Sequence, residues 1–203
     1  MDTNYNVENT ASEIIEKVHE AYSKLNKFNV MILGKTGAGK STLINNIFRV
    51  DLAKTGLGMP ITDQIRKIEI SDYPLAIYDT PGLEMSGKNA VDNLLDEVLG
   101  EIRSGIRSGD MNQMIHCIWY CVATPSHRFE EAEIYFLKNF FGKASSFKIP
   151  VIIVMTQSYS NSDANLLRNK ILSENLPVRD IVPVLAEDFE FDGGTCGTCI
   201  WSG

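Results

Sequence analysis

Apolar residues along the chain alternate between short continuous runs and longer stretches in which they recur every three or four positions. Short runs of this kind predict strands, and they occupy residues 28–33, 65–70, 75–78, 114–122, 149–155 and 180–186. Helical spacing predicts amphipathic helices, and it occupies residues 41–49, 91–106, 130–141 and 166–171. Because strands alternate with helices, the pattern predicts an α/β fold whose mostly parallel sheet is covered on both faces.

The two ends of the chain differ from this alternating region. A capping-box pattern at residues 10–13 precedes an apolar stripe with helical spacing, formed by Ile14, Ile15, Val18, Tyr22 and Leu25. An amphipathic helix ending near Asn26 is expected, and its mixed Glu and Lys polar face favours contact with protein over contact with lipid. The residues after Phe191 are rich in Gly, Thr and Cys, which predicts a tail without regular structure. The predicted division is therefore a helix in residues 1–27, a domain in 28–190 and a flexible tail in 191–203.

Composition and charge are those of a single domain expected in the cytoplasm. The chain has 203 residues, of which 44% are hydrophobic, and this excludes extensive disorder. Its net charge of -7 argues against a broad nucleic-acid surface. No apolar run is long enough to span a bilayer and no signal peptide is visible, so membrane contact is expected only through regions outside this chain. The 4 cysteines do not form a disulfide scaffold, and the Cys196 and Cys199 pair lacks the second pair that a zinc site needs.

The first motif that carries chemistry is a phosphate-binding loop. The segment GKTGAGKS at residues 34–41 matches GxxxxGK[ST] in full, after a predicted strand and before a predicted helix. Glycines let successive N–H groups point at an anion, and the N-terminus of the following helix favours negative charge. Lys40 is expected to neutralise the β- and γ-phosphate oxygens, and the Ser41 hydroxyl to bind Mg²⁺. The predicted phosphate-binding residues are Gly34, Lys35, Thr36, Gly37, Ala38, Gly39, Lys40, Ser41 and Thr42.

A second motif, DTPG at residues 79–82, follows a predicted strand about forty residues later. Asp79 is expected to hold Mg²⁺ through water, and the Gly82 N–H to bond the γ-phosphate and respond to its loss. Alone, DxxG is also a common turn, but behind a full phosphate-binding loop it favours a nucleotide switch. Thr62, in the loop between the motifs, is the preferred third Mg²⁺ ligand because it lies just before the next strand; Thr55 is the competing residue.

These motifs together resemble the translation-factor-related class of P-loop GTPases. The Gly-Lys-Thr-Gly form of the loop is most similar to that of septins, the immunity-associated GTPases and the chloroplast import receptor GTPases. The resemblance covers roughly residues 28–190 and implies a three-layer P-loop NTPase of the Ras-like type, to which the predicted N-terminal helix is an extra element. It also implies Mg²⁺ as cofactor and GTP or GDP as ligand. Such GTPases carry a last helix for which this sequence shows no counterpart, as in a chain shortened at its C-terminus.

The base-reading motif departs from the family pattern. The family has [NT]KxD after the fifth strand, whereas this chain has Thr156, Gln157, Ser158 and Tyr159, so the carboxylate that accepts the guanine N–H groups is missing. The Ala186 N–H is expected to meet the base carbonyl, as the resemblance implies. Glu187 or Asp188 is a possible replacement for the carboxylate, and a solvated acidic loop is the alternative interpretation.

Hydrolysis also lacks one usual group. Leu83 stands where Ras-like enzymes have a water-orienting Gln, so slow turnover or assistance from elsewhere is expected. The related families associate through their nucleotide faces, and a basic residue after the fourth strand can reach the partner's phosphates. His127 and Arg128 fall in that segment and are assigned this role in a homodimer; the alternative is that both are surface residues capping the helix that begins near Phe129.

The predicted function is therefore Mg²⁺-dependent binding and slow hydrolysis of GTP by a dimerising switch. Lys40, Thr62, Gly82, His127 and Arg128 are the predicted catalytic residues, and Ser41, Thr62 and Asp79 the predicted metal ligands. Two alternatives stay open. One is a structural protein that holds nucleotide with little turnover, and the other is an ATP-using P-loop enzyme, against which Thr62 and the DTPG motif speak.

Overall fold

The structure of this protein is a computed structural model that describes residues 25–48, 64–71, 73–83, 88–185, 189–191 and 194–196. The predicted helix in residues 1–27 falls almost entirely outside this part of the chain, and the three described residues of that range, 25–27, are not helical. No described helix is both long and apolar enough to cross a membrane.

A six-stranded sheet forms the centre of the molecule, in the order β2-β3-β1-β4-β5-β6. Every neighbouring pair is parallel except β2 with β3. This confirms the predicted mostly parallel α/β sheet. The strands are β1 (Phe28–Gly34), β2 (Arg66–Glu69), β3 (Leu75–Asp79), β4 (Cys117–Ala123), β5 (Val151–Thr156) and β6 (Asp180–Pro183).

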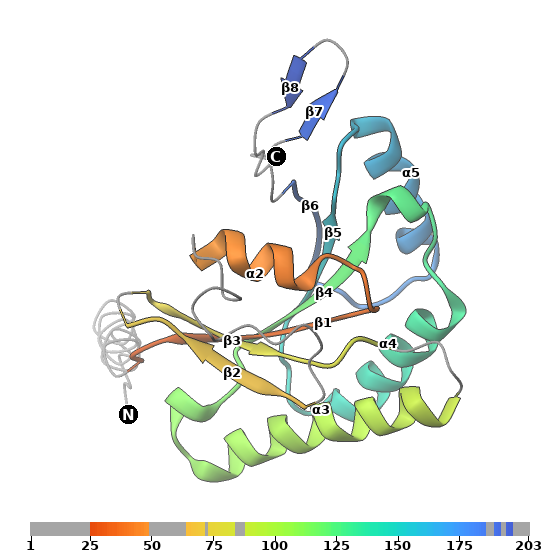
Figure 1. The fold of residues 1–203 in the computed structure, drawn as a ribbon. Helices are drawn as coiled ribbons and strands as arrows, with labels where there is room; N and C mark the ends of the chain where they lie inside the picture. The colour runs from red at the N-terminus through yellow and green to blue at the C-terminus, as the bar shows by residue number, and fades with distance from the viewer. Residues whose placement is uncertain are drawn as a thin grey trace, which may run out of the picture.

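The described helices are divided unequally between the two faces of the sheet (Figure 1). The face with three helices carries α3 (Lys88–Ser108), α4 (Glu131–Ala144) and α5 (Asn161–Ser173). The opposite face carries α2 (Lys40–Phe48), and no second helix covers it among the described residues. Two short 3₁₀ helices, η1 (Met111–Gln113) and η2 (Thr124–Ser126), precede and follow β4.

The core has two parts because alternate residues of each strand point to opposite faces. On the three-helix face, Leu95 and Leu99 of α3 and Phe136 of α4 pack against Tyr120 of β4. On the other face, Ile44 and Phe48 of α2 pack against Ile77 and other strand residues. Cys117 and Cys121 are free buried thiols on this second face, as their apolar surroundings in the sequence predict, and burial raises the pKa of Cys121 to about 12.

The structure differs from several predicted bounds: α5 begins at Asn161 rather than Leu166, β6 ends at Pro183 rather than Ala186, and two further differences have a clear physical reason. β4 begins at Cys117 rather than Met114, because residues 111–113 form a 3₁₀ turn whose N-cap, Asp110, accepts a hydrogen bond from the Asn112 N–H (2.9 Å). The tail was expected to lack regular structure, yet β8 (Gly194–Cys196) pairs antiparallel with β7 (Phe189–Phe191). Backbone pairing decides the second case, since a Gly and Thr-rich segment has no propensity signal that would predict a strand.

Candidate functional site

The phosphate-binding loop follows β1 and leads directly into α2, as its sequence motif requires. Gly34 and Gly39 have φ values of 140° and 75°, which favour glycine. A Cβ at Gly34 would collide with the carbonyl oxygen of Cys121 on the neighbouring strand β4, and one at Gly39 would lie 3.3 Å from the Thr156 hydroxyl. The glycines therefore permit both the backbone conformation of the loop and its close approach to β4 and to the end of β5.

Lys40 is held at the start of α2 by the carbonyl groups of its own loop. Its Nζ donates hydrogen bonds to the carbonyl oxygens of Gly34 (3.0 Å) and Lys35 (3.2 Å), and the residue is buried. Burial lowers the pKa of Lys40, while the carboxylate of Asp79 opposes this shift. A cation that is partly desolvated and held in place by two carbonyls is suited to receive the charge of a bound phosphate.

The DTPG segment lies against this loop. Asp79 is the last residue of β3 and is buried, and the Thr80 hydroxyl donates to the carbonyl of Ile32 (2.8 Å). Gly82 is packed onto Thr36 so closely that a Cβ there would collide with the threonine hydroxyl and lie 2.9 Å from its backbone nitrogen. The Leu83 N–H donates to the Gly34 carbonyl (3.0 Å). The structure thus brings together two motifs that are separated by about forty residues of sequence.

The donor set near the loop fits Mg²⁺. Ser41 supplies a hydroxyl in the first turn of α2 and is exposed, while Asp79 supplies a carboxylate at the end of β3. Mg²⁺ prefers such oxygen ligands and keeps several waters, so it needs few protein groups. Thr62, the preferred third ligand, and its competitor Thr55 lie outside the described residues. Within the described residues, no group of three or more His, Cys, Asp or Glu side chains gathers elsewhere as a metal cluster.

On the side expected to read the base, the end of β5 is tied to the loop. The buried Thr156 hydroxyl donates to the carbonyl of Ala38 (2.8 Å). Gln157 has a left-handed backbone (φ 54°), and its Nε2 would lie 3.4 Å from a Cβ at Gly39. Thr156 and Gln157 therefore lie beside the phosphate-binding loop. Ala186, Glu187 and Asp188 are outside the described residues.

The segment after β4 separates His127 from Arg128. His127 ends η2 in a left-handed conformation (φ 47°), with its Nε2 3.8 Å from Asp163 of α5, and its carbonyl accepts a hydrogen bond from Lys170 (2.6 Å). Arg128 lines a pocket of about 180 Å³ beside the phosphate-binding loop, which also borders it. His127 thus contacts α5, and Arg128 is the member of the pair that lies next to the loop. Neither residue caps α4, whose N-cap is Glu130.

Glu130 and Glu133 are site residues that the sequence analysis missed. The Lys35 ammonium pairs with the Glu130 carboxylate (2.5 Å), which joins the loop to the start of α4. Glu133 closes a capping box by accepting the Glu130 N–H (3.0 Å), and burial raises its pKa to about 7. The signal in the sequence was a Glu-x-x-Glu pair at a helix start, in which Glu replaces the Ser or Thr of the usual box.

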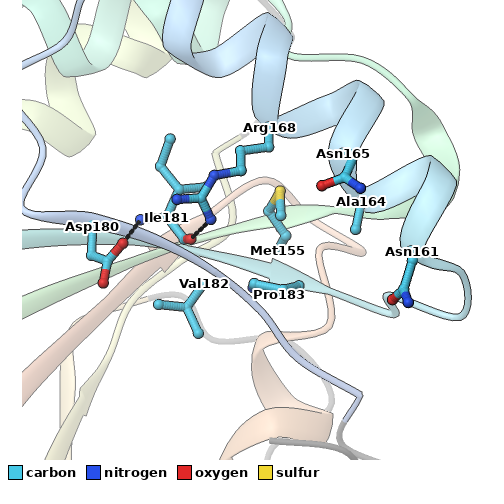
Figure 2. Close-up of a pocket in the computed structure, with 9 residues that line it drawn as sticks. All are labelled: Met155, Asn161, Ala164, Asn165, Arg168, Asp180, Ile181, Val182 and Pro183. Carbon is cyan, nitrogen blue, oxygen red and sulfur yellow. Dashed lines mark hydrogen bonds between the residues drawn. The ribbon is translucent and has the colours of Figure 1, made fainter. Parts of the chain in front are cut away.

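A larger pocket, of about 560 Å³, lies away from the phosphate-binding loop, between α5 and the edge strand β6 (Figure 2). Arg168 of α5 reaches over to β6 and donates to the carbonyl of Ile181 (2.7 Å), and Asp180 bonds the Ile181 N–H (2.7 Å). None of the residues predicted for the nucleotide site lines this pocket. Its volume alone therefore does not mark it as the centre of the chemistry.

The family is decided by a match that takes in both motifs. A model of the family described as 50S ribosome-binding GTPase matches residues 29–157, from the start of β1 through Thr156 and Gln157. The chain belongs to this GTPase family. The resemblance to P-loop GTPases and the fold class drawn from the sequence are thereby confirmed.

Septins are among the curated proteins similar to this GTPase. Septin-2B of Xenopus tropicalis is 24% identical over 169 residues, which are 73% of this chain and 47% of the septin. Human septin-12 is 24% identical over 185 residues, or 80% of this chain and 51% of the septin. The chain therefore spans about half the length of the curated relatives it matches.

Among solved structures, the fold is similar to that of Toc33 from Arabidopsis thaliana. Its complex with Mg²⁺ and GMPPNP gives a TM-score of 0.51 at 18% identity, over 88% of this chain and 79% of that one. A variant of Toc33 described as a dimerization deficient mutant gives a TM-score of 0.54 at 17% identity, over 86% of this chain and 76% of that one. At this level of identity the likeness concerns the fold alone.

Proposed function

We propose that this GTPase binds GTP and GDP together with Mg²⁺, hydrolyses GTP slowly, and acts as a nucleotide-controlled dimerising switch. The observation that carries the proposal is the contact between the two motifs, in which Gly82 and Leu83 rest on Thr36 and Gly34. A segment that touches the phosphate-binding loop directly is able to respond to whether a γ-phosphate is present.

The loop residues receive the phosphates in this proposal. Backbone N–H groups of the loop and of the first turn of α2 bind phosphate oxygens, because the N-terminus of a helix has positive partial charge and its first N–H groups have no partner within the helix. Lys40 neutralises the β- and γ-phosphates from its position over the Gly34 and Lys35 carbonyls. Ser41 and Asp79, with Thr62, would hold Mg²⁺, which would supply positive charge against the negative charge that develops on the phosphates.

Low turnover follows from the residue after the DTPG motif. Leu83 is apolar and 1% exposed within the core on the three-helix face, so it offers no group to orient an attacking water. The water must then be positioned by another group. This argues for slow hydrolysis by the isolated chain and for a faster reaction when a partner completes the site.

A second copy of this chain is the proposed source of the missing group. Arg128 lies beside the loop, in a pocket shared with Lys35, Thr36 and Gly37, so a dimer formed across this face brings the two loops and the two arginines close together. An arginine supplied by a partner stabilises charge on the transferred phosphoryl group. His127 is proposed to form a hydrogen bond to a phosphate across the same interface. The description of one Toc33 variant as dimerization deficient supports looking for a dimer of this chain.

Guanine is the proposed base, with Thr156, Gln157, Ala186 and Glu187 next to the ring. Since the usual carboxylate is absent, selectivity over adenine depends on whether Glu187 or Asp188 replaces it, because a site that pairs the guanine N–H groups discriminates strongly. A nucleotide-binding structural protein with little turnover is the second candidate function, favoured by the buried Leu83.

Turnover and binding measured together separate these functions. The purified chain is titrated with labelled GTP and ATP in Mg²⁺, and phosphate release is followed over a range of protein concentrations. The proposal expects preferred GTP binding and slow release of phosphate, with a specific activity that rises with protein concentration. Tight GTP binding without phosphate release supports the structural alternative, and equal affinity for GTP and ATP contradicts the guanine assignment.

A further inference from the structure

The sheet face that carries α2 is covered unevenly. Phe48 of α2 contacts Tyr73 near the β2–β3 turn, with ring centroids 5.4 Å apart, and the same cluster includes Ile68 of β2 and Ile77 of β3. α2 therefore covers the β2-β3-β1 half of this face, and the same cluster extends to Cys117 and Cys121 of β4 and Val154 of β5, which are also buried. The β4-β5-β6 half has no helix over it among the described residues.

Apolar side chains gather on that open half. Trp119 of β4 and Ile152 of β5 are neighbours in the sheet register, and both are only partly buried against the α2-side core. Val184, just after β6, is partly buried on the same side. These three residues are called the Trp119 patch. An apolar surface that includes a tryptophan marks a place where another segment or molecule packs.

The chain itself enters beside this half of the face. Phe28 begins β1, has the same strand parity as Val30 and Ile32 of the α2-side core, and is 41% exposed. Its ring stacks on His116, just before β4, with centroids 5.1 Å apart. Just upstream, the Asn26 N–H donates to Asn112 (2.8 Å), before β4, while Lys27 Nζ donates to the Ile70 carbonyl (2.7 Å) and the Phe28 N–H to the Pro74 carbonyl (2.8 Å), both before β3. The described chain thus enters between the starts of β3 and β4, and β4 carries Trp119.

We infer that the amphipathic segment of residues 10–25 docks on the Trp119 patch and supplies the helix that this half of the face lacks. Its stripe, with Ile14, Val18, Tyr22 and Leu25, offers apolar groups at helical spacing. As a helix these residues extend roughly 24 Å at about 1.5 Å per residue, whereas β1 and β5 are separated by only about 10 Å at the usual strand spacing. The segment is therefore long enough to cross β4 and β5 from the entry point.

Trp119 provides a direct readout in the full chain. The sequence has 2 tryptophans, so Trp201→Phe leaves Trp119 as the single fluorophore. In this background Val18→Glu places a charge in the apolar stripe, and Ser23→Glu places the same charge on the polar side as a matched control. Docking predicts blue-shifted emission and weak acrylamide quenching in the parent. Val18→Glu is then expected to shift emission to longer wavelength and raise the quenching constant, and Ser23→Glu to leave both unchanged.

Other occupants of the patch give different results. If a second copy covers it, quenching of the parent rises on dilution and follows the monomer fraction in sedimentation, which overturns the inference. If acrylamide already quenches Trp119 strongly in the parent, and Val18→Glu changes neither the emission wavelength nor the quenching constant, the inference is also overturned. Far-UV circular dichroism and binding of labelled GTP verify that each variant keeps its fold. Because Trp119 fluorescence does not depend on nucleotide hydrolysis, failure of this inference can be distinguished from failure of the proposed function.

Discussion

The Gly34 carbonyl accepts two hydrogen bonds, one from the Leu83 N–H (3.0 Å) and one from Lys40 Nζ (3.0 Å). One backbone oxygen thus connects the residue after the DTPG motif to the lysine expected at the phosphates. If the Lys40 ammonium moves when a triphosphate binds, it therefore alters the hydrogen bonding of the same carbonyl oxygen that accepts the Leu83 N–H. This shared acceptor is the physical basis for treating residues 79–83 and the phosphate-binding loop as a coupled pair.

Gly82→Ala is expected to disturb this coupled pair. The new methyl group would collide with the Thr36 hydroxyl and approach the Thr36 backbone, so the DTPG segment must move away from the loop. We expect at least about a tenfold loss of GTP affinity, equivalent to about 1.4 kcal/mol, with a smaller loss for GDP. Titration with labelled nucleotides measures both. Gly100→Ala is the control, because a Cβ there meets nothing within 4 Å. Equal losses for the two nucleotides would contradict a role in sensing the γ-phosphate.

Lys40→Ala is expected to weaken triphosphate binding strongly. Hydrogen bonds to charged groups contribute about 1.5–3 kcal/mol, which corresponds to a loss of roughly ten- to a hundredfold in affinity. The matched control is Lys138→Ala, which removes an exposed lysine of α4 that pairs with Glu174 (2.9 Å) far from the loop in sequence. Isothermal titration with GTP and Mg²⁺ gives both values. Unchanged affinity in Lys40→Ala would rule out the phosphate-site assignment.

Glu133→Gln is expected to remove a pH dependence of stability. Burial raises the pKa of Glu133 from 4.5 to about 7, so the carboxyl is favourable in the folded state when it is protonated. The stability that protonated Glu133 contributes is fully present below pH 4.5. It is lost as the pH rises through 7, and the loss in free energy of unfolding is at most about 3 kcal/mol. Glutamine stays neutral and keeps an oxygen for the Glu130 N–H.

Urea unfolding between about pH 4 and pH 8 measures this effect. We expect Glu133→Gln and the unmodified protein to be similar in free energy of unfolding at the acidic end, and the variant to be more stable at the alkaline end. A constant difference across this range would show that Glu133 does not titrate within it. Glu131→Gln is the control, because it changes an acidic residue in the same first turn of α4 that is exposed.

Arg128→Ala is expected to lower GTP turnover while leaving GTP affinity nearly intact. An arginine supplied by a partner accelerates phosphoryl transfer by roughly a thousandfold or more, so a decrease of at least about tenfold in specific activity is expected at concentrations that favour the dimer. Arg107→Ala, in the last turn of α3, is the control. Turnover that is independent of protein concentration, in a GTP-bound monomer, would return the search for the missing group to residues of the same chain, such as Glu84, which follows Leu83 in the sequence.

Local patterns were sufficient to predict most of the elements. Strands β1, β3 and β5 and helices α2, α3 and α4 follow from apolar runs and helical spacing, because each is defined by residues close in sequence. The phosphate-binding loop was predictable for the same reason, since its glycines, Lys40 and Ser41 are close together in the sequence. The start of β4 was wrong by three residues, because a side-chain cap on η1 competes with the apolar pattern.

By itself, the sequence determined the fold class, the order of its elements and the chemical groups of the phosphate site, all of which depend on short-range periodicity and on one eight-residue motif. The tertiary structure decided which distant groups meet. It placed Leu83 on the Gly34 carbonyl, paired Lys35 with Glu130, joined Thr156 to Ala38, and set Arg128 rather than His127 beside the loop. The physical reason is that these contacts depend on the register of neighbouring strands and on where each strand ends in the sheet, and spacing along one chain does not encode either.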